Sequence, residues 1–275
     1  MKKALFFCTA AIMGLSVLSC SKDDNAGKDS GFVINNYQLI TLSNSKAYSK
    51  DVYTPTYDSR GRVVKSVYET YSSAKGKNEL LTVEIRDFDY KTSTAYATYC
   101  MEILTPGALY VTGPDTLSLK FGDGLKLKKA TKPDYSYDYT YDGDHLESYS
   151  VAIAENDPTV RKYIWSGGDL ASMLGENGKA QFNVTYGEEA NPFVNTIDPL
   201  LAIYSSIIPD YACANLIGKN SAHLPVSYQE DFYGDTTFSF EYTRDDKGRI
   251  VRVDITGDDP DVDYGKTLLI SYSSL

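Results

Sequence analysis

The sequence predicts an all-β protein in which an antiparallel meander of about 14 strands forms a curved or barrel-like sheet. The first observation is a turn written twice, at residues 58–65 and 245–252: Asp, any residue, a base, Gly, Arg, a β-branched residue, Val and a base. Asp accepts hydrogen bonds from the backbone ahead of it, and Gly adopts φ > 0 at little cost. The second is alternation of apolar and polar residues between turn signals. The third is one stretch of helical spacing, which predicts a short helical insert.

The predicted strands follow one another with short turns between them. Looser copies of the repeated turn, at residues 141–146 and 165–170, extend the hairpin pattern. Within residues 80–88, apolar residues alternate with Thr82, Glu84 and Arg86, which predicts a half-buried antiparallel strand. Gly113-Pro114 predicts a turn. The ranges with strand patterns are 32–42, 53–57, 63–71, 80–88, 94–104, 117–121, 135–141, 146–154, 160–165, 170–174, 180–186, 226–232, 236–242, 250–255 and 267–272.

The helical insert is predicted at about residues 197–217. Asp198 and Pro199 suit an N-cap and a first helical position, and Pro209 suits the stop. A second short helical turn is expected between residue 210 and Gly218. Such an insert most often covers or plugs the end of a β core, although an amphipathic helix that binds a partner is the alternative. The apolar residues at helical spacing are Ile197, Leu200, Leu201, Tyr204 and Ile208.

The N-terminal residues predict where in the cell the protein resides. Two lysines precede an apolar run over residues 4–18, which is shorter than the ~20 residues of a membrane-spanning helix. Leu18-Ser19-Cys20 resembles the lipobox of a bacterial lipoprotein, so Cys20 is expected to be acylated and to anchor the chain in a membrane. Residues 1–19 are then a signal peptide, residues 20–31 a flexible tether and residues 32–275 a single β domain.

The tether residues indicate on which side of the outer membrane the protein lies. Ser21-Lys22-Asp23-Asp24-Asn25 resembles the acidic export signal that follows the lipidated Cys in Bacteroidetes surface lipoproteins. We therefore expect the protein on the outer membrane at the cell surface, with an anchor that faces the periplasm as the alternative. The net charge of −10 argues against nucleic acid as a partner and against direct docking on anionic lipid head groups.

The chemistry-bearing residues predict no catalytic, metal or cofactor site. The four acids between residues 258 and 263 lack the spacing of a calcium loop, and His145 and His223 stand in unrelated contexts. No Gly-x-Ser-x-Gly elbow or phosphate loop is present. Cys100 and Cys213 remain after processing, and the sequence leaves open whether they form a disulfide or two buried thiols.

Tyrosine is the residue type in unusual supply, with 24 Tyr against 10 Phe and one Trp. The residues Tyr135, Tyr137, Tyr139 and Tyr141 occupy one face of a strand. Such a row could stack on sugar rings or on a partner protein, so these four residues are candidates for ligand binding. Trp165, beside Gly167-Gly168, is a further candidate. The alternative is that all five fill the concave side of the sheet.

The chain resembles a family of Bacteroidetes lipoproteins with a domain of unknown function described as porin-like in fold. The resemblance is carried by the hairpins of Tyr, Asp and Gly followed by Arg and a β-branched residue, by Tyr186-Gly187 with Asn191-Pro192-Phe193, and by residues 218–225. It covers most of residues 32–275. The hairpins are also similar to YD-type repeats of bacterial surface proteins, without their fixed period. The resemblance implies a porin-like fold and a lipid-anchored location, and it implies no catalytic residues.

These observations together predict a lipid-anchored, non-enzymatic binding or accessory module. Its expected ligand is a carbohydrate or a protein partner in the envelope. One alternative is a glycan-active hydrolase that uses carboxylates, and another is a purely structural envelope lipoprotein. A transmembrane channel is not expected, because strands such as 80–88 carry Glu84 and Arg86 on the face opposite their apolar residues.

Overall fold

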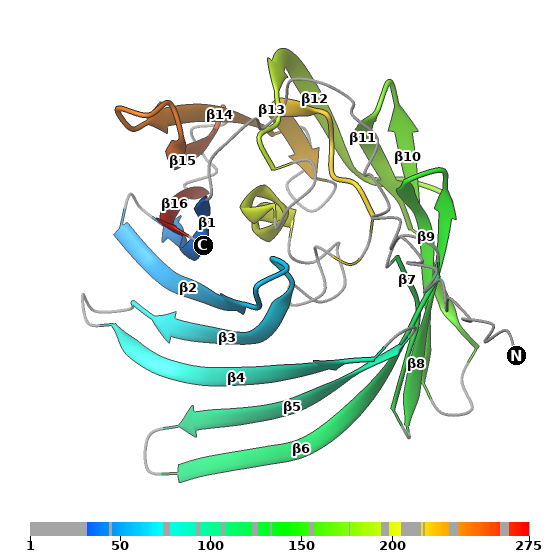
Figure 1. Ribbon diagram of the computed structural model, residues 1–275. Helices are drawn as coiled ribbons and strands as arrows, with labels where there is room; N and C mark the ends of the chain where they lie inside the picture. Colours follow the sequence, from blue (N-terminus) through cyan, green and yellow to red (C-terminus); the bar gives the residue numbers. More distant parts are fainter. Residues whose placement is uncertain are drawn as a thin grey trace, which may run out of the picture.

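The structure is a computed structural model that forms a closed barrel of 16 antiparallel strands (Figure 1). Each strand pairs with the next, and the last strand pairs with the first, with Leu39 opposite Leu268. The strands are β1 (Phe32–Ser43), β2 (Lys46–Tyr57), β3 (Val63–Ser72), β4 (Glu79–Tyr90), β5 (Thr94–Thr105), β6 (Ala108–Phe121), β7 (Leu127–Lys132), β8 (Tyr135–Asp142), β9 (His145–Ile153), β10 (Thr159–Ser166), β11 (Asp169–Leu174), β12 (Ala180–Ala190), β13 (His223–Glu230), β14 (Thr237–Arg244), β15 (Ile250–Gly257) and β16 (Tyr264–Ser274).

The described part of the chain is interrupted at several connections. Only the backbone is described for residues 99–105, 108–112, 114, 115, 135 and 202–204. The described ranges are 32–43, 46–73, 78–91, 94–105, 108–122, 126–132, 134–153, 157–175, 177–193, 198–204, 216, 218–230, 236–258 and 264–274. The predicted signal peptide and tether lie outside them. Within these ranges, no helix has the length and apolar character needed to cross a bilayer.

The predicted all-β, barrel-like meander is confirmed, but the strand count was too low. β7 was missed because three of its six residues are lysines, which hide the apolar alternation. The turn predicted at Gly113-Pro114 was wrong, because both residues lie inside β6. Gly113 adopts φ +105° there, and the register between β5 and β6 shifts nearby, so the strand accommodates the break and continues.

The four related turns all lie at one end of the barrel, called here the turn end, because each follows an even-numbered strand of an up-and-down meander. The opposite end is called the loop end. In the first copy, Asp58 Oδ1 accepts hydrogen bonds from the amides of Arg60 and Arg62, at 2.9 and 3.0 Å. In the second copy, Asp245 Oδ1 accepts the same bonds from Lys247 and Arg249. The predicted hairpin chemistry of the repeat is therefore confirmed.

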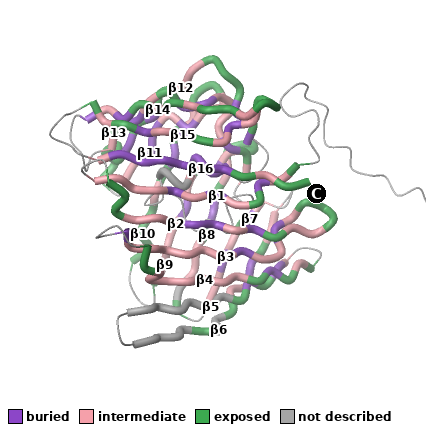
Figure 2. Tube along the Cα trace, turned by 90° about the vertical axis from the view of Figure 1, so that its left-hand side faces the viewer, coloured by how far each residue is buried: buried purple, intermediate pink, exposed green. Residues whose placement is uncertain are grey.

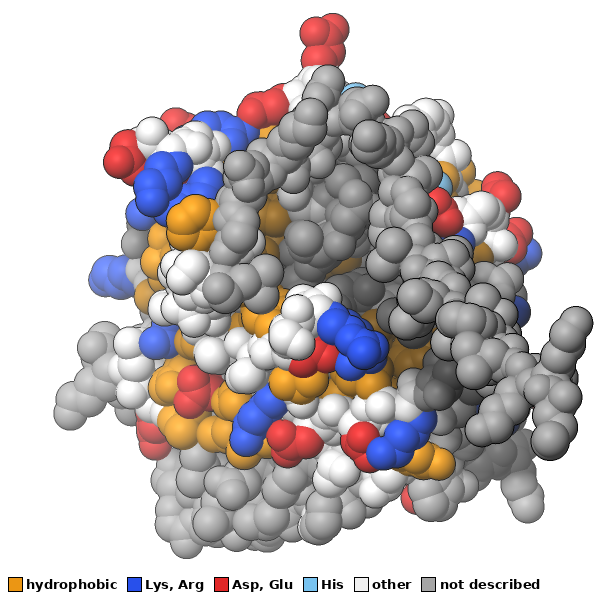
Figure 3. Space-filling view, viewed as in Figure 1, with side chains coloured by type: hydrophobic (Ala, Val, Ile, Leu, Met, Phe, Trp, Pro, Cys, Tyr) orange, Lys and Arg blue, Asp and Glu red, His pale blue; other side chains and the backbone are white. Residues whose placement is uncertain are grey.

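The two faces of the wall differ in character. Large apolar side chains such as Tyr53, Leu119, Phe182 and Leu268 point into the lumen and are fully or almost fully buried. Residues of intermediate exposure alternate with buried ones along the strands (Figure 2). The outward positions carry many charged side chains, and acidic and basic groups surround the rim of the barrel in Figure 3. Outward charged residues are Lys65, Glu69, Asp87, Lys120, Lys129, Asp138, Lys162, Glu241, Arg252 and Asp254.

β4 departs from the orientation that its alternation favoured. Its register places Glu84 opposite Tyr68, which in turn lies opposite the buried Tyr53, so Glu84 and Arg86 face the lumen. The apolar residues Val83 and Ile85 face outward. The reason lies further along the strand: Phe88 and Tyr90 share the face of Glu84 and pack in the core, and this fixes the orientation.

The chain segment between β12 and β13, residues 191–222, is called here the insert. It carries the 3₁₀ helix η3 (Pro199–Tyr204), which lies inside the barrel near β1 and β16 (Figure 1). The helical insert was predicted at about 197–217: Leu200 N donates to Asp198 Oδ1 at 2.9 Å as expected of a cap, and the helix that follows from Pro199 is the short 3₁₀ helix η3. Most of residues 205–217 lie outside the described ranges.

Candidate functional site

An aromatic girdle lines the lumen at the turn end. At this end of seven even-numbered strands, an aromatic residue donates a hydrogen bond to a backbone carbonyl of the preceding strand. Tyr141 Oη donates to Leu127 O and Trp165 Nε1 donates to Leu146 O, both at 2.7 Å. Phe121 ends the remaining even-numbered strand and stacks on Tyr90. The seven donors are Tyr57, Tyr90, Tyr141, Trp165, Tyr186, Tyr242 and Tyr272.

Three residues of the predicted tyrosine row, Tyr137, Tyr139 and Tyr141, face the lumen, and Tyr139 is core. Tyr139 is 6% exposed and lies between Tyr137 and Tyr149, with ring centroids 6.5 and 6.2 Å away. Tyr149 stacks in turn on Tyr163, at 6.2 Å. Burial raises the pKa of both Tyr149 and Tyr163. Tyr137 and Tyr141 are half-buried at the edge of this cluster. The side chain of Tyr135 lies outside the described residues.

A group of charged residues faces the lumen toward the loop end. Lys266 on β16 is 8% exposed and lies opposite the buried Ile255, and Glu230 on β13 lies opposite the buried Phe182. Burial lowers the pKa of Lys266, and the charges of Glu230 and Asp51 oppose that shift. Burial raises the pKa of both carboxyls, against the opposing charge of Lys266. The three residues therefore form an electrostatically coupled group inside the barrel.

Other polar side chains face the lumen near this charged group. Glu84 and Arg86 form an ion pair at 3.0 Å whose side chains are about one-fifth exposed, and Tyr68 and Thr70 both hydrogen-bond Asp51. These side chains are half-buried, so water reaches this side of the lumen. An aromatic wall with carboxylates, a guanidinium and hydroxyls can both stack on a ring and exchange hydrogen bonds with a polar ligand.

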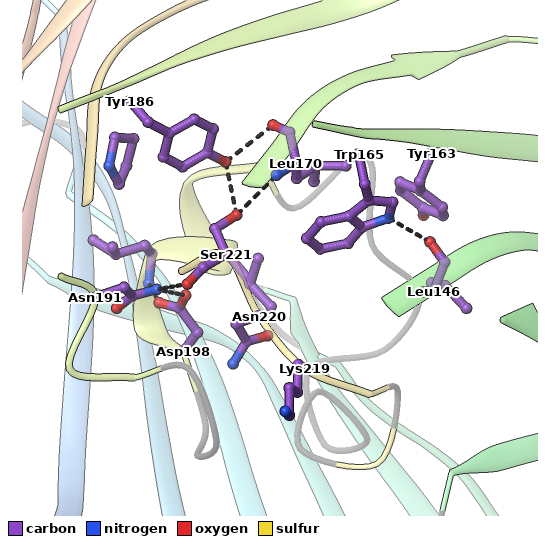
Figure 4. Close-up of a pocket in the computed structure, with 13 residues that line it drawn as sticks. Leu146, Tyr163, Trp165, Leu170, Tyr186, Asn191, Asp198, Lys219, Asn220 and Ser221 are labelled. Carbon is purple, nitrogen blue, oxygen red and sulfur yellow. Dashed lines mark hydrogen bonds between the residues drawn. The ribbon is translucent and has the colours of Figure 1, made fainter. Parts of the chain in front are cut away.

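A small cavity lies between the insert and the wall (Figure 4). Its water-accessible volume is about 30 Å³, and the surrounding hollow of about 530 Å³ is continuous with solvent. One wall is aromatic and the other carries amide, hydroxyl and carboxylate groups. The lining residues are Leu146, Tyr163, Trp165, Leu170, Tyr186, Asn191, Asp198, Leu200, Leu201, Lys219, Asn220, Ser221 and Pro225.

A closed ring of hydrogen bonds fixes the insert against this wall. Leu170 N donates to Ser221 Oγ at 3.1 Å, and Tyr186 Oη donates to Leu170 O at 3.0 Å. Because the Tyr186 proton is used in this way, the 2.9 Å contact between the two hydroxyls requires Ser221 Oγ to donate to Tyr186 Oη. Lys219 N and Ala222 N donate to carbonyls of two turns at the turn end, Asp144 O and Gly168 O.

Asp198 is the one carboxylate among the described residues that line the cavity. It is 4% exposed, and its Oδ2 accepts a hydrogen bond from Asn191 Nδ2 at 3.1 Å. Burial raises the pKa of Asp198 to about 6, although the hydrogen bonds from Asn191 and Leu200 lower it. Lys219, the basic residue of the lining, pairs instead with Asp144, at 3.1 Å between Nζ and Oδ2. The hydrogen bonds that Asp198 accepts therefore come from neutral groups, Asn191 Nδ2 and Leu200 N.

Both histidines lie where the insert returns to the wall. The His145 ring stacks on Trp165 with centroids 4.3 Å apart, and its Nδ1 lies 3.3 Å from Lys219 O. His223 Nδ1 lies 2.8 Å from Asp169 Oδ2. In the described part of the chain, no group of three or more His, Cys, Asp or Glu side chains is arranged to hold a metal.

The structure unites some of the predicted candidates and adds others. Trp165 lines the cavity, whereas the described side chains of the Tyr row lie outside its lining and Tyr139 is core. The predicted lipidation site, Cys20, lies outside the described residues, as does Cys213, so the disulfide question stays open. Asp198 was expected as a cap, and the cap carried no sign of a cavity. Lys266 gave no sequence signal, because its burial depends on the register of β16 with β15.

Comparisons with solved structures report the fold. A porin-like protein from Bacteroides uniformis matches with a TM-score of 0.64 at 14% identity, over 87% of this chain and 98% of that one. A porin-like protein from Bacteroides vulgatus matches with a TM-score of 0.45 at 15% identity, over 88% and 99%. The first likeness confirms the porin-like fold that the resemblance implied. No family model and no curated protein matches the chain.

Proposed function

We propose that this chain is an outer-membrane lipoprotein, anchored at the cell surface through Cys20, whose barrel is a non-enzymatic binding module outside the bilayer. The carrying observation is the distribution of residues across the wall. Transmembrane barrels have an apolar outer band and a polar lumen. Here the core lies in the lumen, and charged residues such as Lys129, Glu241 and Arg252 face outward in the middle of their strands.

Magnitudes favour a barrel that stays in water. A Lys or Arg on the lipid face costs about 2–4 kcal/mol at the bilayer midplane. The outward charged residues named above lie on eight strands, so burial of this wall in lipid would impose that cost many times. A lipid chain on Cys20 would hold such a body at the membrane without inserting it, since each buried CH₂ contributes about 0.8 kcal/mol.

The ligand is proposed to bind in the lumen toward the loop end. Described residues of the insert, Lys219 and Ala222, contact the wall at the turn end, whereas Tyr137 and the Glu84–Arg86 pair are half-buried and reachable by water. A carbohydrate suits this surface, because a sugar ring stacks on tyrosine and its hydroxyls pair with carboxylates and guanidinium. A protein partner in the envelope is the second ligand class that the same surface fits.

A glycan-active hydrolase is the second candidate function. The observation that favours it is the raised pKa of Asp51 and Glu230, both half-buried in the lumen, because a carboxyl with a raised pKa can act as a general acid. Release of reducing ends during the binding assay described next would support this candidate.

The test uses the chain from Ser21 to Leu275, titrated against a panel of polysaccharides by affinity electrophoresis. We expect retardation by one glycan and its loss in the variants Tyr137→Ala and Arg86→Gln, because both side chains face the lumen. Tyr96→Ala is the matched control, since Tyr96 is 45% exposed on the outer face. Retardation that survives in the lumen variants but fails in Tyr96→Ala would contradict a lumen site. No retardation by any glycan would leave the protein partner, to be sought by cross-linking in the envelope.

A further inference from the structure

We propose that the cavity between the insert and the wall binds a small cation that carries N–H donors, such as an ammonium ion or the head group of a primary alkylammonium. This site is separate from the loop-end lumen, and it does not depend on the proposed function. The argument starts from Asp198, the buried carboxylate that lines the cavity.

Asp198 has unused acceptor capacity and no basic partner among the described residues. Each carboxylate oxygen accepts one hydrogen bond, from Leu200 N and from Asn191 Nδ2. A carboxylate oxygen can accept two, so both oxygens retain an acceptor site. An ionised carboxylate removed from water is costly unless a cation pairs with it. A cation in the adjacent cavity would supply that pair.

The fold keeps the lysine of the lining away from this carboxylate. Lys219 Nζ pairs with Asp144, which also accepts from Lys126 Nζ at 2.6 Å, so the ammonium group of Lys219 is engaged by Asp144 and not by Asp198. Lys219 N also donates to Asp144 O at 2.8 Å, which fixes the backbone beside the ion pair. Lys219 therefore does not neutralise the negative charge of Asp198 at the cavity.

The remaining lining suits an ammonium group. Trp165, Tyr163 and Tyr186 present rings to the cavity, and ring faces attract cations. The hydroxyl and amide oxygens on the opposite wall are acceptors for N–H donors. A volume of about 30 Å³ has room for roughly two waters, so an ammonium or methylammonium ion fits. Tetramethylammonium lacks the N–H donors that these acceptors would bind.

Titratable groups on three elements lie near Asp198. Tyr186 on β12 and Tyr242 on β14 both face it, and its charge contributes to the raised pKa of each tyrosine. Lys219 belongs to the insert itself. Both tyrosines are neutral at physiological pH, so the carboxylate is the group whose ionisation decides cation affinity.

The single tryptophan makes the test direct, because Trp165 lines the cavity and reports on it by its emission. The chain from Ser21 is titrated at pH 7.5 with methylammonium chloride, against NaCl and tetramethylammonium chloride at equal ionic strength. We expect a saturable change in Trp165 emission and a raised thermal midpoint with methylammonium alone. The Asp198→Asn variant is expected to lose both responses.

Two results would overturn the proposal: responses to methylammonium equal to those in NaCl, or an unchanged methylammonium response in Asp198→Asn. Wild-type protein provides a second measurement that needs no variant. At pH 4.5 Asp198 is mostly protonated, because its pKa is about 6, so methylammonium is expected to bind about 30-fold more weakly than at pH 7.5. Equal affinity at the two pH values would also refute the carboxylate as the binding group.

Discussion

At the scale of single residues, Asp198 links the cap of η3, the cavity and the acid stability of the protein. Its folded-state pKa of about 6 lies above the ordinary value of 3.8. Between these values the native state holds a proton that the unfolded state has released. Stability from this group is therefore present at about pH 4 and is lost as the pH rises toward 6.

The size of this effect follows from the shift. A pKa raised from 3.8 to about 6 corresponds to a loss of about 3 kcal/mol in unfolding free energy across that window. We expect the loss in denaturant titrations of wild-type protein, compared with Asp198→Asn, in which it is absent. The comparison cancels the opposite trend from Asp58, Asp144 and Asp245, whose lowered pKa values remove stability below pH 3.8. Parallel profiles of the two proteins would contradict the buried, ionisable Asp198.

Sequence reasoning identified Asp198 as a cap and Trp165 as a candidate, but it did not bring them together. Their proximity depends on the insert folding back into the barrel, where Ser221 joins Leu170 and Tyr186 in one hydrogen-bonded ring. The turn residues that anchor the return, Asp144 and Gly168, lie far from Ser221 in the sequence. No local pattern encodes such a contact, so the cavity was invisible before the structure.

At the scale of elements, the repeated turn shows how local chemistry fixes a hairpin. Gly61 and Gly248 adopt φ of +73° and +78°, and a Cβ added at either would meet no atom within 4 Å. Substitution there is therefore a test of backbone conformation alone. Arg62 lies over the Tyr90 ring and Arg249 over the Tyr272 ring, with the guanidinium carbon 4.4 and 4.8 Å from the ring centroids, so each turn also contacts the girdle.

We expect Gly248→Ala to lower the unfolding free energy by about 1 kcal/mol, because the left-handed backbone conformation costs a residue with a Cβ this amount of free energy. Gly61→Ala should cost a similar amount. Denaturant unfolding measures both, with Ser59→Ala in the first turn as the control for mutation of an exposed turn residue. Stability equal to wild type in both glycine variants would show that the turns relax into another conformation.

The girdle was only half visible in the sequence. Its aromatic residues precede the turns, and two of them, Tyr141 and Trp165, begin the looser copies of the repeated turn at residues 141–146 and 165–170. Other members follow no fixed spacing: Tyr90 bonds to Val63, whereas Tyr186 bonds to Leu170. The physical rule is a hydrogen bond across a hairpin of variable length. A search for a constant period cannot detect it.

At the scale of the whole molecule, the sequence predicted the all-β class and a curved or barrel-like sheet, but it did not specify which strands close the barrel. Alternation gives the face of each strand, but nothing local states how many strands complete a barrel or that β16 returns to β1. β4 illustrates the limit, since its apolar residues Val83 and Ile85 face outward while Glu84 and Arg86 face the lumen. The pairing and packing with neighbouring strands, rather than the alternation within one strand, decide which face points into the barrel.

The polar outer wall and the proposed anchor give a joint prediction. The chain from Ser21 should remain monomeric without detergent in sedimentation velocity experiments, because charged residues are spread over eight strands of the outer wall. The full-length protein should partition with outer membranes, and Cys20→Ala should abolish acyl labelling and release the protein to the soluble fraction. Aggregation of the chain from Ser21 that only detergent reverses would contradict a wall built for water. Membrane retention of Cys20→Ala would contradict the anchor.

The pairing of Phe32 on β1 with Ser274 on β16 has a consequence for how the protein reaches its native state. Neighbouring hairpins can form as soon as their residues are available, yet the seam needs the first and the last strand together. Contacts of such large sequence separation slow folding. Until the C-terminal strand arrives, both β1 and the growing sheet present open edges that invite pairing with other chains. The final strand is therefore the segment whose loss would most expose the protein to aggregation during its biogenesis.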